Sequence, residues 1–198
     1  MVMWQGIWRS GTEWCDLTRV GDGWRLAGTV LLAVDGIPAE VRYKVALDAS
    51  WATREVDITS RSGSDVRMRR IHLAADQKQI WHRQESLAPD AAGPLVELEG
   101  VRGLFDIDLG FSPSTNTLPI RRLAPPIAEA VDVTAVWLRY PELTIEPLPQ
   151  RYIRLDERRY RYESNGRAFV AELEVDELGL VVAYEGGWQR IGEAAEGH

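Results

Sequence analysis

Apolar and polar side chains alternate at a period of two along the first part of the chain, which is the pattern of strands with one buried face. The clearest run covers Trp24–Val34, and two more follow at Val41–Leu47 and Trp51–Thr59. Asp35-Gly36 separates the first two runs, and this dipeptide is typical of a two-residue hairpin turn. Another turn is expected at Ser62–Asp65. The pattern predicts an antiparallel meander, because such short turns join antiparallel neighbours.

The second part of the chain continues in the same style. Val131–Tyr140 is apolar on both faces and therefore predicts a central strand. Tyr152–Ser164 predicts one further strand, which ends at Asn165-Gly166, a second strong hairpin signal. Helical periodicity is nearly absent, and only Pro125–Ala130 and the tail after Gly192 favour short helices.

These elements add up to roughly ten strands in one meander. A meander of this length has to curl in order to hide its edge strands from other chains. The predicted fold class is therefore mainly β, with a single curved antiparallel sheet that forms an open or partial β-barrel and a few short helices. A length of 198 residues fits one domain, and we expect residues 1–198 to form it.

Charge and hydropathy narrow the classes of function. The net charge of −7 argues against nucleic acid as a partner, because phosphate binding needs a basic surface. No stretch approaches the roughly 18 apolar residues of a membrane-spanning helix, so we expect no transmembrane segment. The N-terminus lacks the pattern of a secretory signal peptide, which favours a cytoplasmic protein.

Cysteine and histidine, on which many catalytic and metal sites are built, are scarce in this chain. Cys15 is the single cysteine, so no intramolecular disulfide can form. His72 and His82 do not have the spacing of metal ligands, and we expect no metal site. No glycine pattern matches a phosphate-binding loop or a dinucleotide fingerprint, and no serine lies in a nucleophile elbow. We therefore expect no cofactor and no recognisable set of catalytic residues.

The segment that follows Leu104 carries most of the chemical information. If Leu104–Phe111 is a strand, Asp106 and Asp108 share one of its faces. Two neighbouring carboxylates can carry out acid–base chemistry, because their repulsion separates their pKa values. They can also bind a cation, or form ion pairs with Arg121 and Arg122. The sequence leaves all three uses open.

The next residues form a loop, Ser112–Thr117, that is rich in hydroxyl and amide groups. Its Thr115 and Asn116 offer hydrogen-bond donors and acceptors, and Arg121 and Arg122 can hold a phosphate or carboxylate in a bidentate manner. This combination suits a sugar or phosphate head group. The alternative is a turn that is stapled by its own side chains and whose arginines pair with the two aspartates.

The run from Asp106 to Leu123, DIDLGFSPSTNTLPIRRL, resembles the signature of the putative glycolipid-binding family, which was formerly a domain of unknown function. The resemblance extends over nearly the whole chain. Upstream it includes GWRLAGT at 23–29, VRY at 41–43 and DASW at 48–51; downstream it includes AVWL at 135–138, YRYE at 160–163, ELEVD at 172–176 and GLVV at 179–182. The resemblance implies an open, curved antiparallel sheet similar to the half-barrel lipoprotein carriers of the bacterial envelope.

The function that this resemblance implies is non-enzymatic binding of a small amphipathic ligand, such as a glycolipid or an acyl-linked polar metabolite, in the concave face of the sheet. The chain has eight tryptophans, whose large apolar rings with one N–H suit such a cavity. The expected contacts to the polar head group are Asp106, Asp108, Thr115, Asn116, Arg121 and Arg122. The expected contacts to the apolar part are Trp24, Trp51, Trp81 and Trp137.

Two alternatives stay open. The first is a small lyase, isomerase or hydrolase that uses Asp106 or Asp108 as a general base and Arg121 to stabilise an anion. The second is a structural or interaction module in which the run from Asp106 to Leu123 only closes the sheet. In that case, removal of Arg121 or Asp106 would unfold the protein.

Overall fold

A computed structural model of the chain describes residues 1–7, 11–73, 80–85 and 96–194, with the backbone alone described at 72–73, 80–85 and 99. Fifteen strands, two short 3-10 helices and one α-helix make up its regular structure. The strands are β1 (Val2–Gly6), β2 (Gly11–Val20), β3 (Gly23–Val34), β4 (Ile37–Leu47), β5 (Thr53–Ser62), β6 (Asp65–Leu73), β7 (Ile80–Glu85), β8 (Val96–Glu97), β9 (Asp106–Leu109), β10 (Ala130–Arg139), β11 (Thr144–Arg154), β12 (Arg159–Ser164), β13 (Phe169–Val175), β14 (Val181–Tyr184) and β15 (Trp188–Glu193). The helices are η1 (Glu99–Val101), η2 (Ser114–Asn116) and α1 (Thr117–Leu123).

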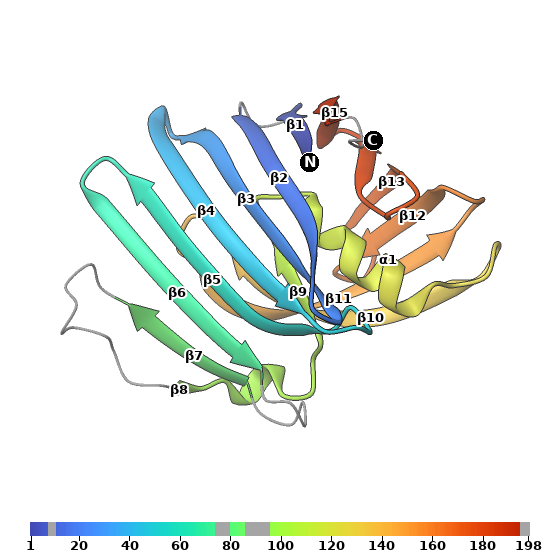
Figure 1. Ribbon diagram of the computed structural model, residues 1–198, viewed down its shortest axis with the longest axis horizontal. Coiled ribbons are helices and arrows are strands. Elements are labelled where there is room, and N and C mark those ends of the chain that lie inside the picture. Colours follow the sequence, from blue (N-terminus) through green and yellow to red (C-terminus); the bar gives the residue numbers. More distant parts are fainter. Residues whose placement is uncertain (8–10, 74–79, 86–95, 195–198) are drawn as a thin grey trace.

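All the described strands belong to one sheet. Its order is β8-β7-β6-β5-β4-β3-β2-β1-β15-β14-β13-β12-β11-β10-β9, and every pair is antiparallel except β9 and β10, which run parallel. The sheet curves strongly, and in the view of Figure 1 α1 lies between β2 and strands β12 and β13. Because β8 and β9 end the order without pairing to each other, the sheet stays open. The predicted fold class is thereby confirmed.

Local sequence explains the hairpins. Asp35 and Gly36 have φ values of 51° and 79°, as a primed two-residue turn requires, and they join β3 directly to β4. Asn165 and Gly166 also have positive φ values, 50° and 65°, between β12 and β13. Both turns were predicted from their dipeptides, since asparagine, aspartate and glycine enter this region at low cost.

The β9–β10 end of the sheet packs inside the curve of β3–β5. The backbone N–H of Thr53, at the start of β5, donates to the carbonyl oxygen of Phe105 just before β9 at 3.0 Å. Phe111, which follows β9, contacts the ring of Tyr43 on β4, with 6.2 Å between ring centroids, and the ring of Tyr140 at 5.6 Å. The second face of β9 and β10 remains available for a site.

The structure corrects several strand predictions. Tyr152–Ser164 is not one strand, because a turn around Asp156 separates β11 from β12. The run at 131–140 is β10, which lies next to the edge strand β9 and not at the centre. It is apolar on both faces because one face packs in the core and the other borders a cavity. The early strands β1 and β2 were not predicted, and the count of roughly ten strands was too low.

The helix predictions were also wrong in position. Pro125–Ala130 contains no helix, and β10 already begins at Ala130. The described part of the tail after Gly192 is strand and coil, and residues 195–198 lie outside the described residues. The one α-helix among the described residues lies where a loop and two arginines were expected, at Thr117–Leu123. None of the helices in the described ranges is long and apolar enough to cross a membrane.

Candidate functional site

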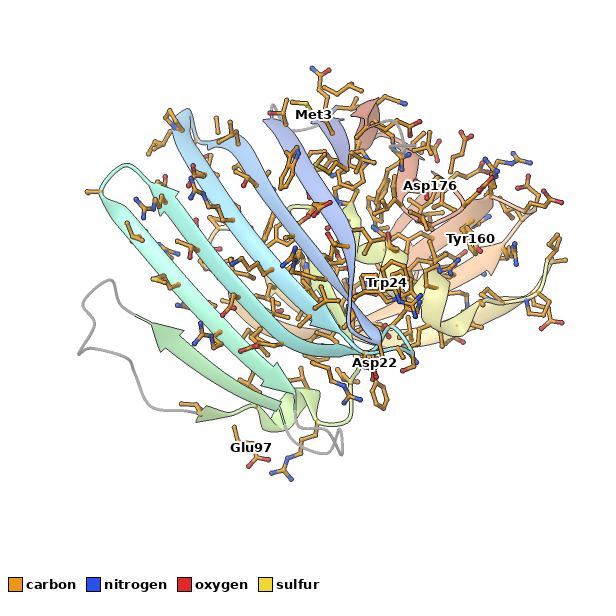
Figure 2. All side chains as sticks on the ribbon, in the orientation of Figure 1. Met3, Asp22, Trp24, Glu97, Tyr160 and Asp176 are labelled. Carbon is orange, nitrogen blue, oxygen red and sulfur yellow. The ribbon has the colours of Figure 1, made fainter. Side chains whose placement is uncertain are left out.

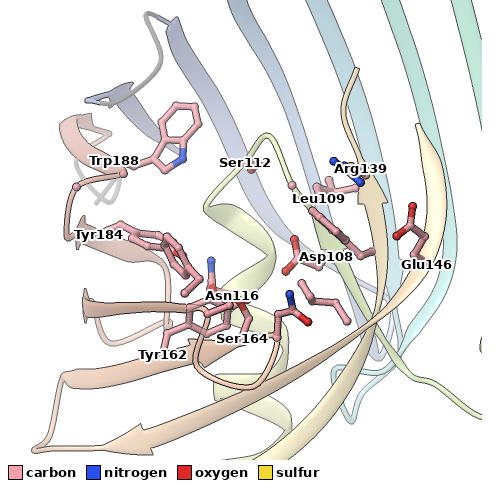
Figure 3. Close-up of a pocket in the computed structure, with 18 of the residues that line it drawn as sticks. Asp108, Leu109, Ser112, Asn116, Arg139, Glu146, Tyr162, Ser164, Tyr184 and Trp188 are labelled. Carbon is pink, nitrogen blue, oxygen red and sulfur yellow. The ribbon is translucent and has the colours of Figure 1, made fainter. Parts of the chain in front are cut away.

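A cavity of about 740 Å³ is lined by residues of β9 to β15 and of the segments that join them. Its aromatic lining consists of Trp137, Tyr162, Phe169, Tyr184 and Trp188. Its polar and charged lining includes Asp108, Asn116, Arg139, Glu146 and Ser164. In the view of Figure 3, Asp108 and Asn116 lie between Tyr184 and Trp188 on one side and Arg139 and Glu146 on the other.

Strand register explains why three of these residues are neighbours. Trp137 on β10 pairs with Asp108 on β9 in the parallel ladder, and with Glu146 on β11 in the antiparallel ladder. Residues that are paired across adjacent strands point to the same face. Asp108, Trp137 and Glu146 therefore form one row across the cavity floor, in which the indole ring lies between the two carboxylates. Gly110 permits this arrangement, since a Cβ there would lie 2.5 Å from Trp137 Nε1.

Asp108 is the acidic group set deepest in this row. Gln150 Nε2 donates a hydrogen bond of 2.5 Å to its Oδ2. Burial raises the pKa of Asp108 to about 6, and the hydrogen bond from Gln150 offsets part of that effect. A carboxyl group with this pKa changes its charge just below neutral pH, which suits either ligand recognition or proton transfer.

Tyrosines surround Asp108. Tyr152 Oη donates to Asn116 Oδ1 at 3.0 Å and so ties the loop to β11. Burial raises the pKa values of Tyr162 and Tyr184, and the negative charge of Asp108 raises them further. Both hydroxyl groups therefore keep their protons and can donate hydrogen bonds.

The hydroxyl groups of the Ser112–Thr117 loop are mostly used inside the protein. Thr115 Oγ1 accepts the backbone N–H of Leu109 at 3.2 Å, and Thr117 Oγ1 donates to the carbonyl oxygen of Gly179 at 2.9 Å. Ser112 Oγ donates to Glu13 Oε1 at 2.7 Å, while Ser112 also borders the cavity. The alternative of a turn stapled by its own side chains thus describes most of this loop.

Glu13, on β2, is the buried residue that accepts hydrogen bonds from this loop and from β4. Its side chain is 0% exposed, and Tyr43 Oη donates to its Oε1 at 2.5 Å. Its Oε2 is buried without a hydrogen-bond partner among the described residues. Burial raises the pKa of Glu13 to about 8, although the hydrogen bonds from Tyr43 and Ser112 lower it. Gly28 makes room for the tyrosine, because a Cβ there would lie 2.5 Å from Tyr43 Oη.

Asp106 and Arg122 form a buried ion pair. Asp106 is 1% exposed, its Oδ1 accepts from Arg122 Nε at 3.1 Å, and its Oδ2 also contacts Arg122 Nη2. The guanidinium of Arg122 lies over the ring of Phe105 at 5.4 Å. Burial raises the pKa of Asp106, and Arg122 counteracts this by favouring the charged form. One of the three uses that the sequence left open is therefore realised for this aspartate.

Arg121 points to a different part of the molecule. Its guanidinium lies 5.2 Å above the ring of Trp51, and its Nη1 donates to the carbonyl oxygen of Glu177 at 3.3 Å. Trp51 stacks on Trp24 with 4.8 Å between ring centroids, and Trp24 lies close to α1 in the view of Figure 2. These groups join α1 to the start of β3 and to the turn before β14.

The structure therefore separates the predicted ligand-binding residues into two sets. Asp108, Asn116 and Trp137 line the cavity. The residues that lie away from the cavity and hold the loop and helix in place are Asp106, Thr115, Arg121, Arg122, Trp24 and Trp51. Trp81 belongs to β7, and its side chain lies outside the described residues.

Several cavity residues are missing from the contacts that were predicted from the sequence. Tyr162 and Ser164 alternate on β12, and Phe169 pairs with Ser164 from β13. Tyr184 and Trp188 pair with each other across the β14–β15 turn. Their common signal is that most of them are aromatic and that all lie in the last third of the chain. That signal does not say which face of a strand borders a cavity and which borders the core.

Comparisons with known proteins identify the family. A family model described as "Putative glycolipid-binding" matches residues 1–190. The chain belongs to the Putative glycolipid-binding family. The resemblance expected from the sequence is thus confirmed.

A solved relative has the same fold. The crystal structure of a DUF1089 family protein from Pseudomonas aeruginosa is 33% identical in sequence and superposes with a TM-score of 0.76. The alignment covers 95% of this chain and 97% of that chain. Among curated proteins, none matches this member of the Putative glycolipid-binding family.

Proposed function

We propose that this protein binds one small amphipathic molecule, with a glycolipid as the leading class, in the cavity over β9–β15. The observation that carries the proposal is the mixed lining, in which aromatic rings share one cavity with the carboxylates of Asp108 and Glu146. A volume of about 740 Å³ falls within the range of small-molecule sites. The family description points to the same class of ligand.

Each part of the ligand has a matching part of the cavity. The apolar part would lie against Phe169, Tyr184 and Trp188, because these rings bury a large apolar area. The polar head would lie beside Asp108, at the edge of Trp137. Asn116 would act mainly by shaping this wall, since its amide already bonds to Tyr152 and to the carbonyl oxygen of Pro113.

In this proposal, the predicted residues that lie outside the cavity stabilise the fold and do not contact the ligand. The Asp106–Arg122 pair and the stack of Arg121 on Trp51 hold α1 and the preceding loop against the sheet. Their replacement should lower stability, and should lower affinity only through the displaced loop.

The test is calorimetric titration with octyl β-glucoside of the wild type and of Phe169→Ser. Phe169 is 45% exposed at the cavity, so the substitution removes an aromatic contact without opening the core. The matched control is Leu178→Ser, which changes a 40% exposed apolar residue away from the cavity. We expect roughly tenfold weaker binding for Phe169→Ser and unchanged binding for the control. Equal loss in both variants would contradict the proposal, and no saturable binding of the glucoside by the wild type would exclude a glycolipid as its ligand class.

An acid–base enzyme is the second candidate, and the pKa of about 6 at Asp108 favours it. Arg121, its expected partner, lies on Trp51, so Arg139 would have to supply the positive charge at the cavity. Asp108→Asn separates the two functions. Full loss of turnover on a bound glycoside with unchanged affinity would favour the enzyme, whereas reduced affinity without any turnover in the wild type favours the carrier.

A further inference from the structure

The charged groups of the cavity are unbalanced. Among the described residues that line it, Asp108, Glu146 and Glu185 carry carboxylates, and Arg139 carries the one guanidinium. Arg139 is exposed and lies over the ring of Trp137 at 5.6 Å. The carboxylates of Asp108 and Glu146 are therefore the partly buried charges of the cavity, while Glu185, whose Oε2 accepts the backbone N–H of Glu172, and Arg139 lie at its exposed rim.

The other arginines near this region cannot correct the imbalance. Arg121 and Arg122, which the sequence offered as a grip for phosphate, are held by Trp51 and by Asp106. Arg190 pairs with Asp176 and donates to the carbonyl oxygen of Leu180. None of these three lines the cavity.

The hydrogen-bonding groups point to the same conclusion. Within the described part of the chain, Gln150 is the one donor to Asp108, and its bond goes to Oδ2. Oδ1 of Asp108 is therefore available as an acceptor. Glu146 accepts a hydrogen bond from Thr144 through Oε1, which leaves its Oε2 available. Both carboxylates lie in the same row, on either side of Trp137.

We infer that the cavity selects ligands whose polar head donates hydrogen bonds and carries no negative charge, and that it rejects phosphate, sulfate and carboxylate heads. This inference rests on the proposed function and narrows its ligand class. A hydroxyl or ammonium group can donate to a carboxylate, while an anionic head can only accept. Inside a partly enclosed site the repulsion between like charges is screened less than in water. Two head groups share the required chemistry, a neutral sugar and a protonated amine.

The experiment uses three ligands with the same alkyl chain, so that the apolar contribution stays constant. Octyl β-glucoside, octylammonium and octyl phosphate are titrated into the full chain, each below its micelle concentration, with calorimetry as the readout. We expect the glucoside or the ammonium compound to bind at least about tenfold more tightly than the phosphate. The difference in affinity between the glucoside and the ammonium compound then shows which of the two head groups the site prefers.

Variants show whether the carboxylates cause the selectivity. Glu146→Gln and Glu185→Gln should each reduce the ratio of the dissociation constants of octyl phosphate and the preferred ligand by several-fold. The double variant should reduce this ratio further. The matched control is Glu157→Gln, which removes an exposed carboxylate away from the cavity and should leave the ratio unchanged. An equal effect of the control would mean that net charge acts at long range and would overturn the inference.

The outcomes for the ligand class and for the proposed function differ. Binding of octyl phosphate with an affinity equal to or above that of both other ligands would overturn the inference and leave the proposed function intact. Absence of binding for all three ligands would contradict the proposed function itself.

Discussion

Replacement of Glu13 by glutamine tests whether the stability of the buried network beneath the Ser112–Thr117 loop depends on the protonation of Glu13. Glutamine keeps an oxygen that accepts from Tyr43 and Ser112, but it cannot ionise. Burial raises the pKa of Glu13 from 4.5 to about 8 in the folded protein. The folded state therefore holds this proton more tightly than the unfolded chain does. The resulting stabilisation is fully present below about pH 4.5 and is lost as the pH rises through about 8.

The size of the effect follows from those two pKa values. Each pKa unit corresponds to about 1.4 kcal/mol, so the whole window is worth on the order of 5 kcal/mol. Between about pH 6 and about pH 8.5, where the folded carboxyl ionises, the wild type should lose about 2–3 kcal/mol relative to Glu13→Gln. The stability of the variant relative to the wild type should therefore rise by about 2–3 kcal/mol from the acidic to the alkaline end of this range, on top of the part already lost by the wild type between about pH 4.5 and about pH 6.

The assay is urea unfolding followed by tryptophan fluorescence, with both proteins measured at several values from about pH 6 to about pH 8.5. The titrations of all other groups occur in both proteins and cancel in the difference. Glu157→Gln, at an exposed carboxylate, serves as the control and should follow the wild type. A stability difference between wild type and Glu13→Gln that stays constant across this range would refute the reasoning.

Three further outcomes are expected. Arg122→Ala leaves Asp106 as an unpaired buried carboxylate and should lower the free energy of unfolding by about 3–5 kcal/mol, as measured by urea unfolding. Gly28→Ala pushes the ring of Tyr43 away from its position and should cost about 1–3 kcal/mol, whereas Gly100→Ala, where nothing lies within 4 Å, should cost little; equal losses would contradict this. Asp108→Asn should raise stability at neutral pH, because the proton on Asp108 stabilises the fold fully below pH 3.8 and this contribution is lost as the pH rises through about 6. The gain should vanish in unfolding measurements at acid pH, and a gain that persists there would rule this explanation out.

The last of these expectations bears on function. Glu13 and Asp108 are both acidic groups that folding places where their charge is costly. Glu13 supports the loop from inside the core, whereas Asp108 faces a cavity. A residue that lowers stability while lining a cavity is a typical sign of a binding or catalytic role.

The sequence by itself determined the β class, the meander and the main hairpins. Alternation at period two depends only on neighbouring residues, and so does the turn at Asp35-Gly36. The sequence also marked 106–123 as the segment that sets this family apart. The division of Tyr152–Ser164 at Asp156 was missed, because Asp156 accepts the backbone N–H groups of Arg158 and Arg159 in a turn without glycine or asparagine.

Only the tertiary structure decided what the residues of the 106–123 segment do. Asp106 and Asp108 look alike in sequence, yet one pairs with Arg122 and the other faces a cavity beside Gln150. The buried bond between Ser112 and Glu13 joins residues 99 positions apart. Such contacts depend on how the open sheet curls and on the parallel pairing of β9 with β10. The energy of an ion pair or of a buried carboxyl group depends on neighbours that are distant in the sequence. A local pattern of residues does not show which neighbours these are.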